Sequence, residues 1–337
     1  MSDVFSDLTQ TEPDTSKLPL LPRTSLQISV VRLAREYGLP LILLAISVVT
    51  TTAIGARFMQ NFLDGNPTIV SDNDLWPWPW LFAQPDRFLS GWTFSANLLT
   101  ILLSHEFGHY FACRAHRIRA TLPCVLPAPT LSGTLGAVIQ IKGRIPNRVA
   151  LIDVGIYGPL AGYISSLAAI VAGLLLSRPA TPGHPAALIG FGEPLTIHIV
   201  DAAINLVYPG SPSFGTAVRH PILIAGWIGL LITSLNLIPG GQLDGGHILY
   251  AISPRAHRTL RWFIPAALFL CGFFFWVGWI LWGSMLLIPA MHHPRLTIEE
   301  PLPFNRKLLG WLALVLLLLT FSPSPFAASS IYHYLHW

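Results

Sequence analysis

The chain has 337 residues, of which 52% are hydrophobic and 11% are charged, and its mean hydropathy is +0.57. This composition is too apolar for an ordinary soluble domain and indicates a membrane protein. The net charge of +4 is modest, and nothing in the sequence predicts a nucleic-acid partner.

The first 37 residues predict a disordered cytoplasmic tail. Charged side chains are mixed here with prolines and serines, and no apolar region typical of a cleavable signal peptide lies near the start. We expect a membrane-embedded domain to follow at 38–325, with its catalytic core at about 90–255. Residues 326–337 would then form a C-terminal tail.

Six apolar stretches approach the ~20 residues that a helix needs to cross a hydrocarbon core about 30 Å thick. They cover residues 39–58, 92–113, 149–177, 222–239, 263–282 and 308–321. Unpaired backbone groups are too unfavourable in lipid, and the stretches lack the alternation of a barrel, so each is predicted to be a helix. The predicted fold class is therefore all-α and polytopic, with about six transmembrane helices.

Basic residues gather in three clusters, which the positive-inside rule places on the cytoplasmic side. The clusters are Arg23, Arg32 and Arg35; Arg114, Arg117, Arg119, Lys142, Arg144 and Arg148; and Arg255, Arg258 and Arg261. The acidic loop after the first span and the loop at 178–220 are expected outside. The basic loop at 291–307 is ambiguous: either residues 263–289 form a tight helical pair, or this loop violates the rule.

Prolines and glycines interrupt residues 120–147, which excludes a spanning helix there. Residues 136–142 are rich in β-forming side chains and predict a short membrane-associated hairpin. Irregular backbone at membrane depth must face protein or a watery cavity, so we expect the hairpin to line one. A surface loop on the cytoplasmic face is the alternative. In the external loop, residues 194–207 are long enough for a short helix.

Two histidines in the second span are predicted to bind zinc. His105 and His109 are four residues apart, which places both imidazoles on one face of a helix. Glu106 projects about 100° further around that helix, so it can serve as general base for an attacking water and later protonate the leaving amine. Ionisable side chains are unfavourable inside a span unless they are paired or bind a metal, which argues against a chance match.

A catalytic zinc site needs a third protein ligand, and Asp244 is the best candidate. It follows the fourth span in the sequence Asn-Leu-Ile-Pro-Gly-Gly-Gln-Leu-Asp-Gly-Gly-His at 236–247. Pro239 and the glycines would end or unwind the helix and bring Asp244 into a cavity. Two alternatives stay open: Asp244 caps a short helix at 247–252, or His247 competes as the ligand.

The two motifs together resemble the site-2 protease family of intramembrane metalloproteases, whose signature is His-Glu-x-x-His followed by Asn-x-x-Pro-x-x-x-Leu-Asp-Gly. Further stretches at 132–143, 155–163, 292–297 and 319–325 are similar to a bacterial and plastid branch without an inserted PDZ module. The resemblance covers about 92–325. It implies one Zn²⁺ per chain bound by His105, His109 and Asp244, with Glu106 as the acid/base. It also implies that Asn236 orients substrate or stabilises the oxyanion, whereas the residue alone predicts a helix-packing amide.

Small residues recur along the third span and predict close approach to the catalytic helices. They are Gly155, Gly158, Ala161, Gly162 and Ser165. Asp153 and Tyr157 lie in the same apolar run, and for both we predict a hydrogen-bonding structural role.

The sequence therefore predicts an intramembrane zinc metalloprotease that cleaves transmembrane protein substrates in the lipid bilayer. A substrate helix would unwind locally and pair with the strand near 136–142. A metal-binding protein without protease activity, such as a zinc transporter or a pseudoprotease, is the alternative; ligands at one depth and the intact Glu106 argue against it. The expected location is a bacterial cytoplasmic membrane, with the active site toward the cytoplasm. The sequence specifies neither the substrate nor the oligomeric state.

Overall fold

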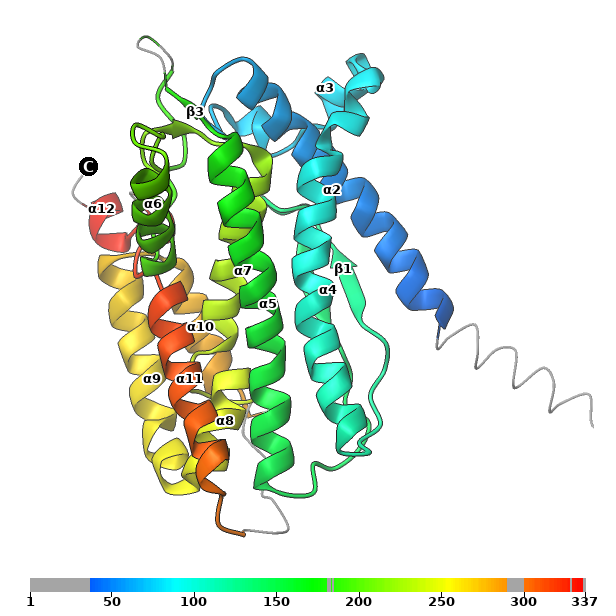
Figure 1. The fold of residues 1–337 in the computed structure, drawn as a ribbon, viewed down its shortest axis with the longest axis vertical. Coiled ribbons are helices and arrows are strands. Elements are labelled where there is room, and N and C mark those ends of the chain that lie inside the picture. The colour runs from blue at the N-terminus through cyan, green and yellow to red at the C-terminus, as the bar shows by residue number, and fades with distance from the viewer. Residues whose placement is uncertain (1–36, 181–182, 184, 290–299, 328, 336–337) are drawn as a thin grey trace, which may run out of the picture.

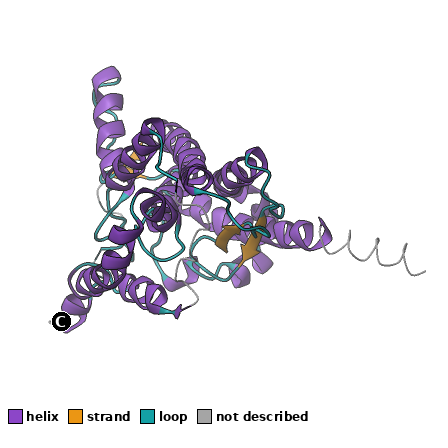
Figure 2. Cartoon of the chain, turned by 90° about the horizontal axis from the view of Figure 1, so that it is seen from below, coloured by secondary structure: helices purple, strands orange, loops and turns teal. Residues whose placement is uncertain are grey.

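The computed structural model describes residues 37–180, 183, 185–289, 300–327 and 329–335, and these are mostly helical. The longer helices lie side by side and run between two ends of the molecule (Figure 1). Figure 2 shows many of them nearly end-on, with the strands confined to small patches. The predicted helical class is confirmed in this coarse form. The predicted N-terminal tail and its basic cluster fall outside the described residues, save residue 37 itself.

The helices are α2 (Leu39–Leu63), α3 (Trp78–Ala83), α4 (Trp92–Ala115), α5 (Arg148–Leu176), α6 (Leu195–Val207), α7 (Pro221–Asn236), α8 (Asp244–Ile252), α9 (Pro254–Phe274), α10 (Gly278–Leu287), α11 (Phe304–Thr320) and α12 (Ile331–Leu335). Two 3-10 helices, η3 (Asp72–Asp74) and η4 (Pro85–Gly91), precede α3 and α4 respectively. By length and composition, α2 and α5 are suited to cross a membrane. The predicted arrangement of six spans is therefore not confirmed.

One predicted span is wrong, because residues 263–282 run across the break between α9 and α10. At this break the Val277 amide donates to the Ser329 carbonyl instead of continuing the helix. A Cβ atom on Gly272 would lie 2.4 Å from the Ile280 side chain, so glycine lets the two helices pack closely. Of the two alternatives for residues 263–289, the structure shows the tight helical pair.

The helical pair places the basic clusters of the described residues at one end of the molecule. The end of α4 and the starts of α5, α9 and α11 all lie at the bottom of Figure 1. Arg306 and Lys307 open α11, so this basic segment lies at the same end as the other clusters. The described members of the predicted basic clusters therefore gather at one end of the molecule.

The predicted hairpin is present as β1 (Cys124–Pro127) paired antiparallel with β2 (Thr134–Val138). The strand is shorter than the predicted 136–142, and beyond it Ile141 makes an isolated bridge to Ala120. The Thr50 hydroxyl of α2 donates to the Gly133 carbonyl over 2.7 Å, and Ser47 donates to the Val125 carbonyl over 3.4 Å. These hydroxyls attach the hairpin to α2.

The loop at 178–220 is closed by a second small sheet of β3 (Arg178–Pro179) and β4 (Ala217–Val218). It contains α6, as predicted from the length of the apolar stretch. Phe326 packs on this region, with its ring 5.4 Å from Trp227 and 6.1 Å from Phe191. Packed structure thus continues into the segment that the sequence assigned to a C-terminal tail.

A buried carboxylate fixes the loop that follows α2. Asp74 is fully buried, and it accepts hydrogen bonds from the Asn61 amide, from the Val70 and Ser71 backbone N–H groups and from the Arg57 guanidinium. Burial alone would raise the pKa of the Asp74 carboxyl, but these hydrogen bonds and the charge of Arg57 outweigh it and hold that pKa below 3.8. The charged form is therefore the one that the fold stabilises.

Asp74→Asn is expected to lower the free energy of unfolding by about 1–3 kcal/mol at pH 7, because the charged acceptor is lost from a buried site. Because its folded pKa is depressed, the Asp74 carboxylate stabilises the protein fully above the unfolded pKa near 3.8, and this contribution is lost as the pH falls through the lower folded pKa. Thermal melts at pH 7 and pH 3 test this, with Asp72→Asn as control because Asp72 is exposed in the same 3-10 helix. Equal melting temperatures for the two variants at pH 7 would contradict the assignment.

Candidate metal centre

Three side chains from two separate segments meet inside the helical bundle. His105 and His109 lie on α4 and are buried, and Asp244 is the first residue of α8. The Oδ2 atom of Asp244 lies 3.3 Å from the Nε2 atom of each histidine. The three candidate ligand atoms all lie within 4.8 Å of one another. The structure thus brings together the residues that the sequence predicts as metal ligands.

The spacing of these atoms fits a zinc ion. Tetrahedral zinc bonds of 2.0–2.1 Å would place neighbouring ligand atoms about 3.3 Å apart. Both distances between Asp244 and the histidines have this value. Two imidazole nitrogens and one carboxylate oxygen are also the donor set of catalytic zinc sites, which leave one position open. The donor set therefore suits Zn²⁺, and the two distances from Asp244 fit its geometry.

A hydrogen bond from Nδ1 orients the His109 ring, whereas His105 Nδ1 is buried with no hydrogen-bond partner among the described residues. The Nδ1 atom of His109 lies 2.7 Å from the Val154 carbonyl of α5. A carbonyl accepts only, so Nδ1 carries the proton and the lone pair is on Nε2, facing Asp244. The Asn236 side-chain nitrogen lies 3.2 Å from His105 Nε2, which places this amide beside the candidate ligands.

Glycines on α5 make room for the two imidazole rings. A Cβ atom on Gly158 would lie 2.1 Å from His109 Nε2, and one on Gly162 would lie 2.9 Å from His105 Nδ1. From the opposite side, a Cβ atom on Gly108 of α4 would lie 2.3 Å from the Tyr157 carbonyl. Of the small residues predicted to pack closely, Gly158 and Gly162 therefore lie against α4, whereas Gly155 lies against α8.

A tight loop after α7 delivers Asp244. Gly241 adopts a positive φ of 58°, and a Cβ atom on Gly245 would lie 2.0 Å from the Leu237 carbonyl oxygen. The His257 ring of α9 supports the loop, with Nε2 3.2 Å from the Gly241 carbonyl. Glycine is required here because the chain folds back against itself.

The two alternatives for this segment do not hold. The N-cap of α8 is Leu243, so Asp244 is already helical, and its carboxylate contacts the two histidines. His247 lies one turn further along α8, where its Cβ faces Gly155. It does not belong to the ligand group found among the described residues.

Glu106 lies next to the ligands and connects them to the hairpin. It is buried, and it interacts electrostatically with His109 and Asp244. The backbone N–H of Ile139, the residue after β2, lies close enough to interact with its carboxylate. The sequence did not predict this contact or that of Val154, because a backbone group leaves no signature in the side-chain pattern.

Asp153 has the structural role predicted for it. Its carboxylate pairs with His116 Nε2 at 2.9 Å and with Arg306 Nε at 2.8 Å. These pairs join α5 to the end of α4 and the start of α11. The role proposed for Tyr157, whose side chain is exposed, stays a prediction.

Gly158→Ala is expected to weaken zinc binding about tenfold or more, because the added Cβ displaces the His109 ring. Competition with a chromophoric chelator measures the affinity in detergent. Gly143→Ala is the matched control, since a Cβ there would meet the Ile118 side chain at an ordinary 3.6 Å. Wild-type zinc affinity in a folded Gly158→Ala protein would show that the glycine does not set the ring position.

Comparison with known proteins agrees with this geometry. Residues 93–278, more than half of the chain, match the model described as peptidase family M50. The probable zinc metalloprotease EGY1 of Oryza sativa subsp. japonica is 36% identical over 158 residues, which are 45% of this chain and 26% of the relative. EGY1 of Arabidopsis thaliana is 29% identical over 307 residues, 86% of this chain and 53% of the relative.

A third relative, EGY2 of Arabidopsis thaliana, is 29% identical over 239 residues, 67% of this chain and 41% of the relative. The chain thus spans about half or less of the length of these relatives. All three are described as chloroplastic. This corrects the predicted location: the relatives point to a chloroplast membrane, and the bacterial cytoplasmic membrane is wrong. Hydropathy could not distinguish the two, since both membranes select the same apolar spans.

Proposed function

Since the chain belongs to peptidase family M50, we propose that it is a zinc metalloprotease that cleaves membrane-anchored proteins in or near their transmembrane segments. The family implies a Zn²⁺ cofactor. The observation that carries the proposal is the convergence of His105, His109 and Asp244 beside the buried carboxylate of Glu106.

Each residue at the site has a distinct task in this proposal. His105, His109 and Asp244 hold the zinc ion, which when bound supplies a Lewis acid for peptide hydrolysis. Glu106 takes a proton from the attacking water on its carboxylate and passes it to the leaving amine. The backbone N–H of Ile139 lies beside that carboxylate. Asn236 offers an amide N–H to the substrate carbonyl, in keeping with its place beside His105.

We propose that the protein crosses the membrane with about six segments: α2, α4, α5, α7, the α9 and α10 pair, and α11. Large apolar side chains are exposed on the outer helices, as expected of surfaces covered by lipid. Examples are Leu41 at 64% and Ile42 at 59% exposure on α2, and Leu318 at 61% on α11. His109 is close to the C-terminal end of α4, so the catalytic residues would lie toward the basic end.

The substrate would bind as an added strand on β2. In the described residues β2 pairs with β1 alone, which leaves its other edge without a strand partner. Leu135 and Val138 are 71% and 49% exposed, so side chains of β2 are accessible. The strand leads directly to Ile139, whose N–H contacts Glu106. An extended peptide on this edge would therefore run toward the catalytic carboxylate.

Glu106→Gln is expected to retain zinc and to lower the rate of cleavage about a hundredfold or more, because the amide cannot accept the proton. Purified protein in liposomes is assayed for zinc content and for cleavage of a panel of single-span substrates. Equal cleavage by the two proteins would exclude Glu106 as the base. Zinc in both with no cleavage by the wild type would instead favour a pseudoprotease.

Val138→Pro is expected to reduce cleavage at least tenfold while zinc stays bound, because proline distorts the strand edge and lacks an N–H. Val138→Ala serves as control, since it shortens the side chain and keeps the backbone donor. Zinc content and melting temperature are measured alongside cleavage. If the proline variant retains full activity, strand addition is not the binding mode.

A further inference from the structure

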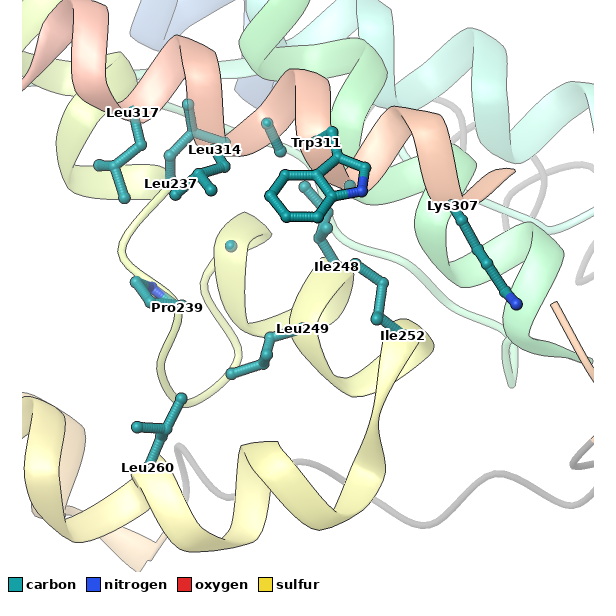
Figure 3. A pocket seen from close by; sticks show the side chains of 13 residues that line it. Leu237, Pro239, Ile248, Leu249, Ile252, Leu260, Lys307, Trp311, Leu314 and Leu317 are labelled. Carbon is teal, nitrogen blue, oxygen red and sulfur yellow. The ribbon is translucent and has the colours of Figure 1, made fainter. Parts of the chain in front are cut away.

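An apolar cavity, open on one side, lies behind the segment that carries Asn236 and Asp244. It has a volume of about 420 Å³ and is enclosed by α8, the start of α9 and one face of α11 (Figure 3). Leu237 follows Asn236 in the chain, and Gly245 follows Asp244. Both residues form part of the cavity wall. The volume lies within the range of 300–1,000 Å³ that is usual for small-molecule sites.

The cavity is apolar along its length and basic at one end. Of the 13 described residues that line it, Lys307 alone is charged. Figure 3 shows Lys307 at one end of the lining face of α11 and Leu317 at the other. Lys307 is exposed, and no hydrogen bond or ion pair to its ammonium occurs within the described part of the chain.

The open side of the cavity faces the surface that lipid would cover. Trp311 is 67% and Leu314 is 43% exposed, so the lining residues of α11 also form part of the outer surface. The Lys307 end lies at the basic end of the molecule, near the start of α11 in Figure 1.

We propose that this cavity binds one acyl chain of an anionic phospholipid, with its phosphate at Lys307. An acyl chain matches the apolar lining, and an anionic headgroup matches the single cation at the membrane surface. The bound chain would pack against Leu237 and Gly245 and so support the loop that presents Asp244. The inference rests on the membrane placement proposed above, but it is tested by lipid retention and not by proteolysis.

The test uses the full-length protein reconstituted in vesicles of phosphatidylcholine with phosphatidylglycerol. The protein is extracted in mild detergent, and retained lipid is counted by native mass spectrometry. We expect about one phosphatidylglycerol per wild-type chain and at least fivefold less on Lys307→Gln. Lys142→Gln is the matched control, because Lys142 is exposed at the same end of the molecule but does not line the cavity.

A second pair of variants tests the apolar part. Leu314→Trp should fill the cavity and reduce retention of both lipid classes at least fivefold. Leu318→Trp, one turn further along α11 and outside the lining, should not. Equal retention by Lys307→Gln and Lys142→Gln, or by the two tryptophan variants, would overturn the proposal. The proposal would also be overturned if the wild type retained no lipid and a photo-crosslinker at position 314 captured a transmembrane substrate. Zinc content in every variant separates a failure of this inference from a failure of the metal centre.

Discussion

The close contact between α4 and α5 is the constraint on which the metal centre depends. Gly108 on one helix and Gly158 and Gly162 on the other leave no space for a Cβ atom, so the backbones approach until the imidazoles rest against α5. At this separation the Val154 carbonyl reaches His109 Nδ1 and fixes which ring nitrogen carries the proton. The close approach of the two backbones at these glycines thus determines which nitrogen of His109 can bind a metal. Close helix packing at small residues is typical of helices in membranes.

Two further segments complete the site by approaching α4 from other directions. The loop after α7 turns sharply at Gly241 and Gly245 and brings the Asp244 carboxylate to both histidines. The β1 and β2 hairpin, attached to α2 by hydroxyl groups, brings the Ile139 N–H to Glu106. Irregular backbone therefore meets the catalytic helix from two sides, which is tolerated at membrane depth where it is enclosed by protein.

The sequence predicted the helices and metal ligands that are determined by residues close together in the chain. Hydropathy located most of the long helices to within a few residues, and the spacing of His105 and His109 indicated a shared helical face. The prediction from hydropathy failed at the break between α9 and α10. The hydrogen bonds that stabilise this break are accepted by the carbonyls of Ser329 and Pro323, which lie far along the chain. The lipid cavity was equally hidden, since its walls come from helices that no sequence pattern brings together.

We propose that two imidazoles and one carboxylate form a single zinc site, and X-ray absorption at the zinc edge tests this arrangement. For the wild type in detergent, we predict four light-atom neighbours at about 2.0–2.1 Å, two of them imidazoles, and no sulfur. Asp244→Asn should lose the metal or change the set of atoms that coordinate it. An unchanged spectrum in that variant, or a sulfur neighbour near 2.3 Å in the wild type, would show that zinc binds elsewhere.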